Sequence, residues 1–112
     1  MKKNNNLYLE DILEAIDRAD EYVSDLTYEE FYENNMAQDA VIRQISIIGE
    51  ALNKVDKEFH KEYPQLPSRD AISMRNVLVH DYDAIDLNRV WATVKDDLPK
   101  LKEMIVKILK PV

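Results

Sequence analysis

The sequence predicts an all-α fold, an up-down bundle of four to five helices. Apolar residues recur three and four positions apart along most of the chain, which is the period of an amphipathic helix. No segment alternates apolar and polar residues, and no Asn-Gly or Asp-Gly hairpin signal occurs. The 112 residues include one glycine and four prolines, so few positions interrupt a helix. A chain of this length is one domain by size, so we expect a single helical domain over residues 1–112.

The first predicted helix runs from Leu7 to about Val23. Charged residues fall between its apolar residues, so it buries one face. Thr27 and Glu30 then have the spacing of a capping box, which predicts a short helix that carries Phe31. A pair of asparagines ends this short helix.

The most buried predicted helix runs from about Met36 to Lys57. It is apolar on more than half of its circumference, so it needs the bundle core on one side and another helix or a second subunit on the other. We therefore expect a homodimer. Gly49 lies inside this helix at a cost of about 1 kcal/mol relative to alanine, which predicts close approach of another backbone. Arg43 and Glu50 are more readily explained as solvated or paired charges than as site residues.

The second half of the chain has two further helical segments. His60 lies among charged residues, and we expect it to be a solvated surface histidine. Pro64 and Pro67 bracket a loop, and Ser68 suits the N-cap of a helix that starts at Arg69. The core residues of that helix are Ala71, Met74, Val77 and Leu78.

The last helical pattern begins after Asp86, a good N-cap, and Pro99 should kink or split it. Its apolar residues are Leu87, Val90, Trp91, Val94 and Leu98, followed by Leu101, Ile105 and Ile108.

Composition excludes several classes of function. There are no cysteines, which excludes a disulfide framework and thiolate catalysis and fits a cytoplasmic location. No apolar run approaches the roughly 20 residues that span a bilayer, and no apolar stretch follows the basic start as in a signal peptide, so we expect no membrane association. The net charge of −7 argues against a general nucleic-acid coat. It leaves open a focused site or a basic protein partner.

Chemical groups concentrate in one stretch, residues 75–82 (Arg-Asn-Val-Leu-Val-His-Asp-Tyr). In a helix, Arg75 and Tyr82 would share one stripe, and Asn76 and His80 would form the adjacent stripe. A cation, an amide, an imidazole and a phenol would then project from one ridge, close enough together to act on one phosphate.

These groups suit metal-independent attack on an RNA phosphodiester, because the 2′-hydroxyl is a nucleophile that RNA itself supplies. His80 titrates near neutrality and can take or give the proton, and Arg75 can hold the non-bridging oxygens as charge builds on them. Asn76 would orient the imidazole or the phosphate, and Tyr82 would bond the phosphate or stack on a base. No metal-ligand spacing and no phosphate-binding glycine loop occurs, so we expect neither metal nor cofactor. Helix packing with an ordinary surface ion pair also explains this spacing.

The stretch from Leu66 to Leu98 resembles the HEPN superfamily, and within it the HepT-like toxins of bacterial and archaeal toxin–antitoxin pairs. The superfamily motif is an arginine, four residues, a histidine, any residue and a tyrosine, with a polar residue commonly after the arginine. Here Arg75, Asn76, His80 and Tyr82 fill it. Further segments that look like the HepT type are Ile47–Ala51, Met74–Asn76, Asp86–Trp91 and Asp97–Pro99.

The resemblance implies a helical bundle that dimerises so that two motifs face one cleft. It implies a metal-independent endoribonuclease in which Arg75 and His80 act on the scissile phosphate of an RNA substrate. It also implies a toxin of a type VII-like pair, with a cognate minimal nucleotidyltransferase antitoxin that in some pairs transfers AMP onto the motif tyrosine, here Tyr82. An AMP group there would block RNA by its bulk and its charge.

This chain departs from the family pattern next to the motif. Asp81 stands where a glycine is usual and Asp83 where an aromatic residue is common, while Ser68 and Ser73 replace a tryptophan and a glycine. The two carboxylates should raise the proton affinity of His80 and repel RNA. They keep open the alternatives of a non-catalytic HEPN module that partners a nucleotidyltransferase, or a helical protein that binds a nucleotide.

Overall fold

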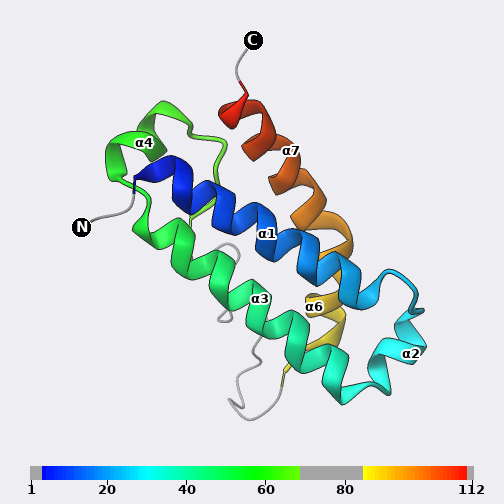
Figure 1. Cartoon of the computed structure of the whole chain (residues 1–112). Helices are drawn as coiled ribbons and strands as arrows, with labels where there is room; N and C mark the ends of the chain where they lie inside the picture. The colour runs from blue at the N-terminus through cyan, green and yellow to red at the C-terminus, as the bar shows by residue number, and fades with distance from the viewer. Residues whose placement is uncertain (1–3, 69–84, 111–112) are drawn as a thin grey trace.

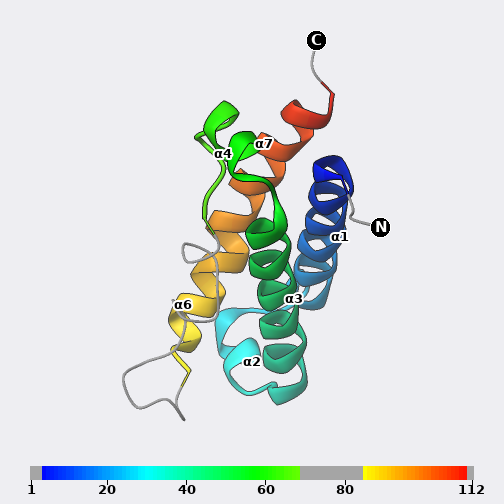
Figure 2. The same cartoon turned by 90° about the vertical axis from the view of Figure 1, so that its left-hand side faces the viewer.

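Two long helices, α1 (Asn5–Val23) and α3 (Asn35–Lys54), lie antiparallel and side by side in the computed structural model (Figures 1 and 2). The structure describes residues 4–68 and 85–110. Asparagine caps both helices: Asn4 Oδ1 accepts from the backbone N–H of Leu7 at 2.9 Å, and Asn34 Oδ1 accepts from that of Ala37 at 2.9 Å. The elements of the described residues are helical, which confirms the all-α fold.

Helix α2 (Tyr28–Tyr32) connects these two helices and begins with the predicted capping box. The backbone N–H of Thr27 donates to Glu30 Oε1 at 2.9 Å, and the backbone N–H of Glu30 donates to Thr27 Oγ1 at 3.1 Å. The Phe31 side chain is fully buried, and its ring centroid lies 5.2 Å from that of Trp91. The short helix is therefore anchored to the C-terminal half of the chain.

Helix α3 ends three residues earlier than its apolar pattern predicts, because Val55 is extended and Asp56 begins α4 (Lys57–Glu62) as its N-cap. The expectation of a solvated His60 is wrong. His60 is half-buried, and its Nε2 lies 3.1 Å from the Leu52 carbonyl oxygen. The histidine side chain thus connects the short helix α4 to the C-terminal end of α3.

The C-terminal helical path consists of α6 (Leu87–Ala92), a π-helical turn η2 (Thr93–Asp97) and α7 (Leu98–Leu109). The side chain of Asp86 caps α6, as predicted. The backbone N–H of Leu98 donates to the Thr93 carbonyl, five residues back, and Pro99 follows in the first turn of α7. Proline has no N–H to donate to the carbonyl of the preceding turn. A π turn interrupts the regular series of hydrogen bonds between residues four apart in an α-helix. The predicted split at Pro99 is therefore present as a widened turn just before the proline.

The described helices share one hydrophobic core, to which α1, α3 and α7 contribute most of the buried side chains. Figure 2 shows the arrangement of these helices. No helix within residues 4–68 and 85–110 is long and apolar enough to cross a membrane. The helix predicted to start at Arg69, with its expected core residues, lies outside the described residues, and the single domain over 1–112 stays a prediction. The largest fully buried side chains are Leu9, Ile12, Phe31, Ile45, Ile48, Leu52, Leu98, Leu101 and Ile105.

Candidate functional site

The four predicted site residues, Arg75, Asn76, His80 and Tyr82, lie outside the described residues, as do the neighbouring carboxylates of Asp81 and Asp83. The nearest described residue on the C-terminal side is Ile85, three positions after Tyr82 in the sequence. Three residues of chain span at most about 11 Å, which limits how far the end of the motif can be from Ile85. The surroundings of Ile85 are therefore the part of the described surface closest to the motif in sequence.

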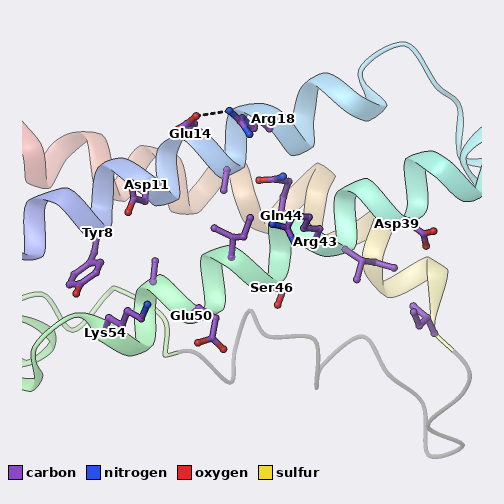
Figure 3. Close-up of a pocket in the computed structure, with 15 residues that line it drawn as sticks. Tyr8, Asp11, Glu14, Arg18, Asp39, Arg43, Gln44, Ser46, Glu50 and Lys54 are labelled. Carbon is purple, nitrogen blue, oxygen red and sulfur yellow. Dashed lines mark hydrogen bonds and ion pairs between the residues drawn. The ribbon is translucent and has the colours of Figure 1, made fainter. Parts of the chain in front are cut away.

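Ile85 is one of the residues that line a groove of about 780 Å³ between α1 and α3, the α1–α3 groove. Figure 3 shows this groove. Helical spacing aligns its lining residues, because positions three and four apart share a face of a helix. The wall from α1 includes Tyr8, Asp11, Glu14, Ala15 and Arg18. The wall from α3 includes Arg43, Gln44, Ile47, Glu50 and Lys54.

The cations of the groove differ in their partners. Arg18 Nη2 donates to Glu14 Oε1 at 2.8 Å along α1, so these two charges largely cancel. Arg43 is exposed, and within residues 4–68 and 85–110 its guanidinium makes no hydrogen bond or ion pair. The same holds for the ammonium group of Lys54 among the described residues. The groove therefore has two cations without an ion-pair partner among the described residues, and four carboxylates also line it: Asp11, Glu14, Asp39 and Glu50.

Gln44 is the most unusual residue of the groove. It is only 5% exposed, yet its amide makes no hydrogen bond to any part of the chain that the structure describes. Burying an amide without a partner costs about 1–3 kcal/mol by mutational measures. Figure 3 shows Gln44 projecting from α3 toward α1, beside Arg43 and facing the Arg18 side of the groove. A donor and an acceptor thus face a cavity that a ligand or water could occupy.

The carboxylates of α3 occupy other parts of the groove. Figure 3 shows Glu50 and Ser46 pointing from α3 away from α1, and Asp39 at the far end of α3 from Lys54. Tyr8 lies toward the end occupied by Lys54. Arg43 is therefore the cation beside Gln44, while Asp11 of α1 points into the groove toward α3.

Sequence reasoning treated Arg43 as an ordinary surface charge and did not single out Gln44. A signal for Gln44 was present, because it lies on the same face as Val41, Ile45 and Ile48, where a polar residue is out of place. Tyr8 and Lys54 have no such signal, since both occur where a half-exposed side chain is usual. No group of three or more potential metal ligands occurs within residues 4–68 and 85–110.

Comparison with known families matches residues 12–108 to the model of the ribonuclease HepT-like family. The chain belongs to this family. The resemblance to HepT-like proteins of the HEPN superfamily is thereby confirmed, and ribonuclease, the enzyme class expected from the sequence, is the activity for which the family is named.

Curated relatives of this HepT-like chain include proteins of Thermococcus cleftensis and Methanocaldococcus jannaschii. The chain is 39% identical over 110 residues to "Probable ribonuclease HepT" of Thermococcus cleftensis. This alignment covers 98% of the chain and 100% of the relative. It is 43% identical over 110 residues to "Gamma-glutamylcyclotransferase and putative RNase MJ0434" of Methanocaldococcus jannaschii, which covers 98% of this chain. The chain spans only 50% of the length of that second relative. No solved structure is significantly similar to the chain.

Proposed function

We propose that this HepT-like protein is a metal-independent endoribonuclease whose catalytic residues are Arg75 and His80. The observation that carries the proposal is the complete motif of Arg75, His80 and Tyr82 in a chain of the ribonuclease HepT-like family. Relatives that bear ribonuclease names and match the chain over 98% of its length support it.

The reaction needs no group beyond the chain and the RNA. His80 takes the proton of the 2′-hydroxyl, whose oxygen attacks the adjacent phosphorus. The bond from phosphorus to the 5′-oxygen of the next nucleotide breaks, and that oxygen receives a proton from an imidazolium. The products are a 2′,3′-cyclic phosphate and a 5′-hydroxyl end. Arg75 stabilises the charge on the non-bridging oxygens, where it is greatest in the transition state.

Asn76 and Tyr82 are positioning residues in this proposal. Asn76 orients the imidazole or the phosphate, and Tyr82 bonds the phosphate or stacks on a base. A homodimer that faces two motifs across one cleft would bring two imidazoles to the substrate, one as base and one as acid.

The proposal includes regulation by a cognate minimal nucleotidyltransferase antitoxin that transfers AMP from ATP to the Tyr82 hydroxyl and releases pyrophosphate. Mass spectrometry after incubation with that enzyme and ATP should find one adenylyl group on the tryptic peptide that contains Tyr82. A Tyr82→Phe variant should remain unmodified. Modification of both proteins, or of neither, would remove Tyr82 from this role.

Cleavage of single-stranded RNA by purified protein tests the enzyme assignment. We expect wild-type protein to cut RNA equally with and without a chelator, and His80→Ala to reduce the rate by at least about 100-fold, since general acid–base catalysis supplies that much. Arg75→Lys, which keeps the charge but loses the planar fork, should be intermediate. Equal rates for wild type and His80→Ala would contradict the proposal.

A second function, a non-catalytic partner of a nucleotidyltransferase, is favoured by the net charge of −7. This binding module predicts that Arg75→Ala leaves partner affinity and every cellular phenotype unchanged. Slower growth on expression of wild type but not of Arg75→Ala would favour the ribonuclease instead.

A further inference from the structure

We infer that the α1–α3 groove binds single-stranded RNA, with Arg43 on a phosphate and Gln44 on the edge of an unpaired base. The inference rests on the proposed function and extends it, because it identifies a substrate-binding surface away from the motif. Both residues are contributed by α3, and Ile85, three positions after Tyr82, lies at the same groove.

The guanidinium of Arg43 suits a phosphate. It is exposed on the groove wall, and the described residues provide it with no hydrogen bond or ion pair. Arginine presents a planar set of donors that matches the oxygens of a phosphate. Most contacts that position nucleic acid on a protein are of this kind.

The amide of Gln44 suits a base edge. Unpaired bases present a donor beside an acceptor, and a side-chain amide can bond both at once, as glutamine does with adenine. The amide is 5% exposed and has no hydrogen-bond partner among residues 4–68 and 85–110, so a base would supply what the fold does not. In an RNA duplex this edge lies in a deep, narrow major groove that side chains cannot read, so it is accessible in single-stranded RNA.

The rest of the groove fits the same ligand. Its volume of about 780 Å³ is within the range of pockets that hold ligands of nucleotide size. Ile47, which is half-buried, provides apolar surface for the face of a base. Tyr8, toward the Lys54 end, provides an aromatic ring of the kind on which bases stack.

Binding must be measured apart from cleavage, so the variants are made in the His80→Ala background. The probe is a fluorescently labelled single-stranded RNA of about 12 nucleotides, within the usual range of single-strand sites, and fluorescence anisotropy gives Kd at several salt concentrations. Arg43→Ala should weaken binding about tenfold at low salt, because a charge-assisted contact is lost. It should also lower the slope of log affinity against log salt by about 0.7, the value for one phosphate contact of a single strand.

Arg89→Ala is the matched control. Arg89 is an exposed arginine of α6 that does not line the groove, and its side chain makes no hydrogen bond or ion pair with the described residues. It removes the same charge from the protein, so it should leave Kd and the salt slope unchanged. Equal effects of Arg43→Ala and Arg89→Ala would mean that only overall charge matters, which would overturn the inference.

Gln44→Leu tests the base contact, because leucine has a similar volume and no hydrogen-bonding groups. The variant should fold with an unchanged or higher Tm, since it removes a buried amide that has no partner among the described residues. It should lose at least about fivefold preference between oligoadenylate and oligouridylate. Retention of the wild-type preference would overturn the role of Gln44. If Gln44→Leu fails to fold, Gln44→Glu, of nearly the same shape, serves as the second variant and should reverse or abolish the preference.

Two further outcomes separate this inference from the proposed function. RNA binding that depends on Arg43, together with no cleavage by wild-type protein, would refute the ribonuclease assignment but support RNA binding in the groove. If wild-type protein cleaves RNA and Arg43→Ala does not change kcat/KM, RNA binding in the groove is refuted while the ribonuclease assignment stands. A change of molecular mass by light scattering in Arg43→Ala, with unchanged RNA affinity, would identify the groove as a subunit interface and would also refute the inference.

Discussion

The backbone N–H of Asp56 donates to the side-chain Oδ1 of Asn5 over 3.1 Å, and Asn5 Nδ2 lies 3.4 Å from Asp56 Oδ2. These two residues are 51 positions apart, and their contact joins the first turn of α1 to the start of α4. The contact holds together the ends of the two helices that form the α1–α3 groove. It also accounts for the early end of α3, since the Asp56 N–H bonds a side chain instead of a helical carbonyl.

Removing this contact should destabilise the protein modestly. We expect Asn5→Ala to lower the free energy of unfolding by about 0.5–1.5 kcal/mol, the net value of a typical hydrogen bond. Urea denaturation followed by circular dichroism measures it. The neighbouring Asn6→Ala is the control, because Asn6 is exposed, and it should change stability by no more than about 0.5 kcal/mol. Equal effects would show that the loss comes from helix propensity and not from the contact with Asp56.

Phe31 should be the main anchor of α2. Its side chain is fully buried against Trp91, whereas Tyr32, the next residue, is 57% exposed. Truncation of a buried phenylalanine removes apolar contacts and leaves a cavity, so Phe31→Ala should cost about 3–5 kcal/mol. Tyr32→Ala, an aromatic truncation on the same short helix, should cost less than about 1 kcal/mol by the same thermal or chemical denaturation. Similar losses for the two variants would contradict this assignment of the core.

Much of the fold was predictable from local sequence. The capping box at Thr27 and the cap at Asp86 are short-range signals, and the apolar stripes of α1 and α3 follow helical spacing. The end of α3 and the burial of His60 were not predictable in this way. Both depend on contacts between segments, with Asn5 in one case and with the Leu52 carbonyl in the other.

The candidate site also has one part that local sequence predicts and one part that depends on contacts between segments. Its motif is contiguous in sequence, so Arg75, His80 and Tyr82 could be proposed without a structure. The α1–α3 groove requires two helices to lie side by side, and no local pattern predicts that Tyr8 and Lys54 line the same groove. Gln44 could have been noticed as a polar residue on an apolar face, but only the three-dimensional structure shows that its amide has no hydrogen-bond partner among the described residues.

Lys102 should add a small stabilisation that depends on pH. Its Nζ lies 2.8 Å from Asp17 Oδ1 and joins α7 to α1, and this hydrogen bond together with the aspartate charge raises the pKa of Lys102. A raised pKa in the folded state means that the stabilisation is complete below the unfolded pKa of about 10.4 and is lost as pH rises through the folded pKa. Both side chains are largely exposed, at 49% and 61%, so the pair should contribute only about 0.2–1 kcal/mol.

A double-mutant cycle of Asp17→Asn and Lys102→Met measures that contribution directly. The coupling energy should be present at pH 8 and shrink above about pH 10.5. A coupling that persists unchanged at high pH would show that charge on Lys102 is not its source.

The homodimer remains a prediction with its own test. In the described residues, Ala51 of α3 is buried within the subunit and Ile47 lines the α1–α3 groove, while Ala40 is half-buried and leaves surface for a partner to cover. Light scattering at micromolar concentration should give twice the mass of one chain. A single-chain mass would remove the shared cleft, and with it the second imidazole of the proposed reaction.

The nature of the RNA ends after cleavage tests the central claim most directly. Wild-type protein should leave 2′,3′-cyclic phosphate and 5′-hydroxyl ends, detected by mass spectrometry of the fragments. A single 2′-deoxy substitution at the cleaved nucleotide should stop cutting at that bond only, because it removes the nucleophile. Cleavage at the substituted bond, or fragments with 5′-phosphate ends, would contradict attack by the 2′-hydroxyl and therefore the assignment of Arg75 and His80 to that chemistry.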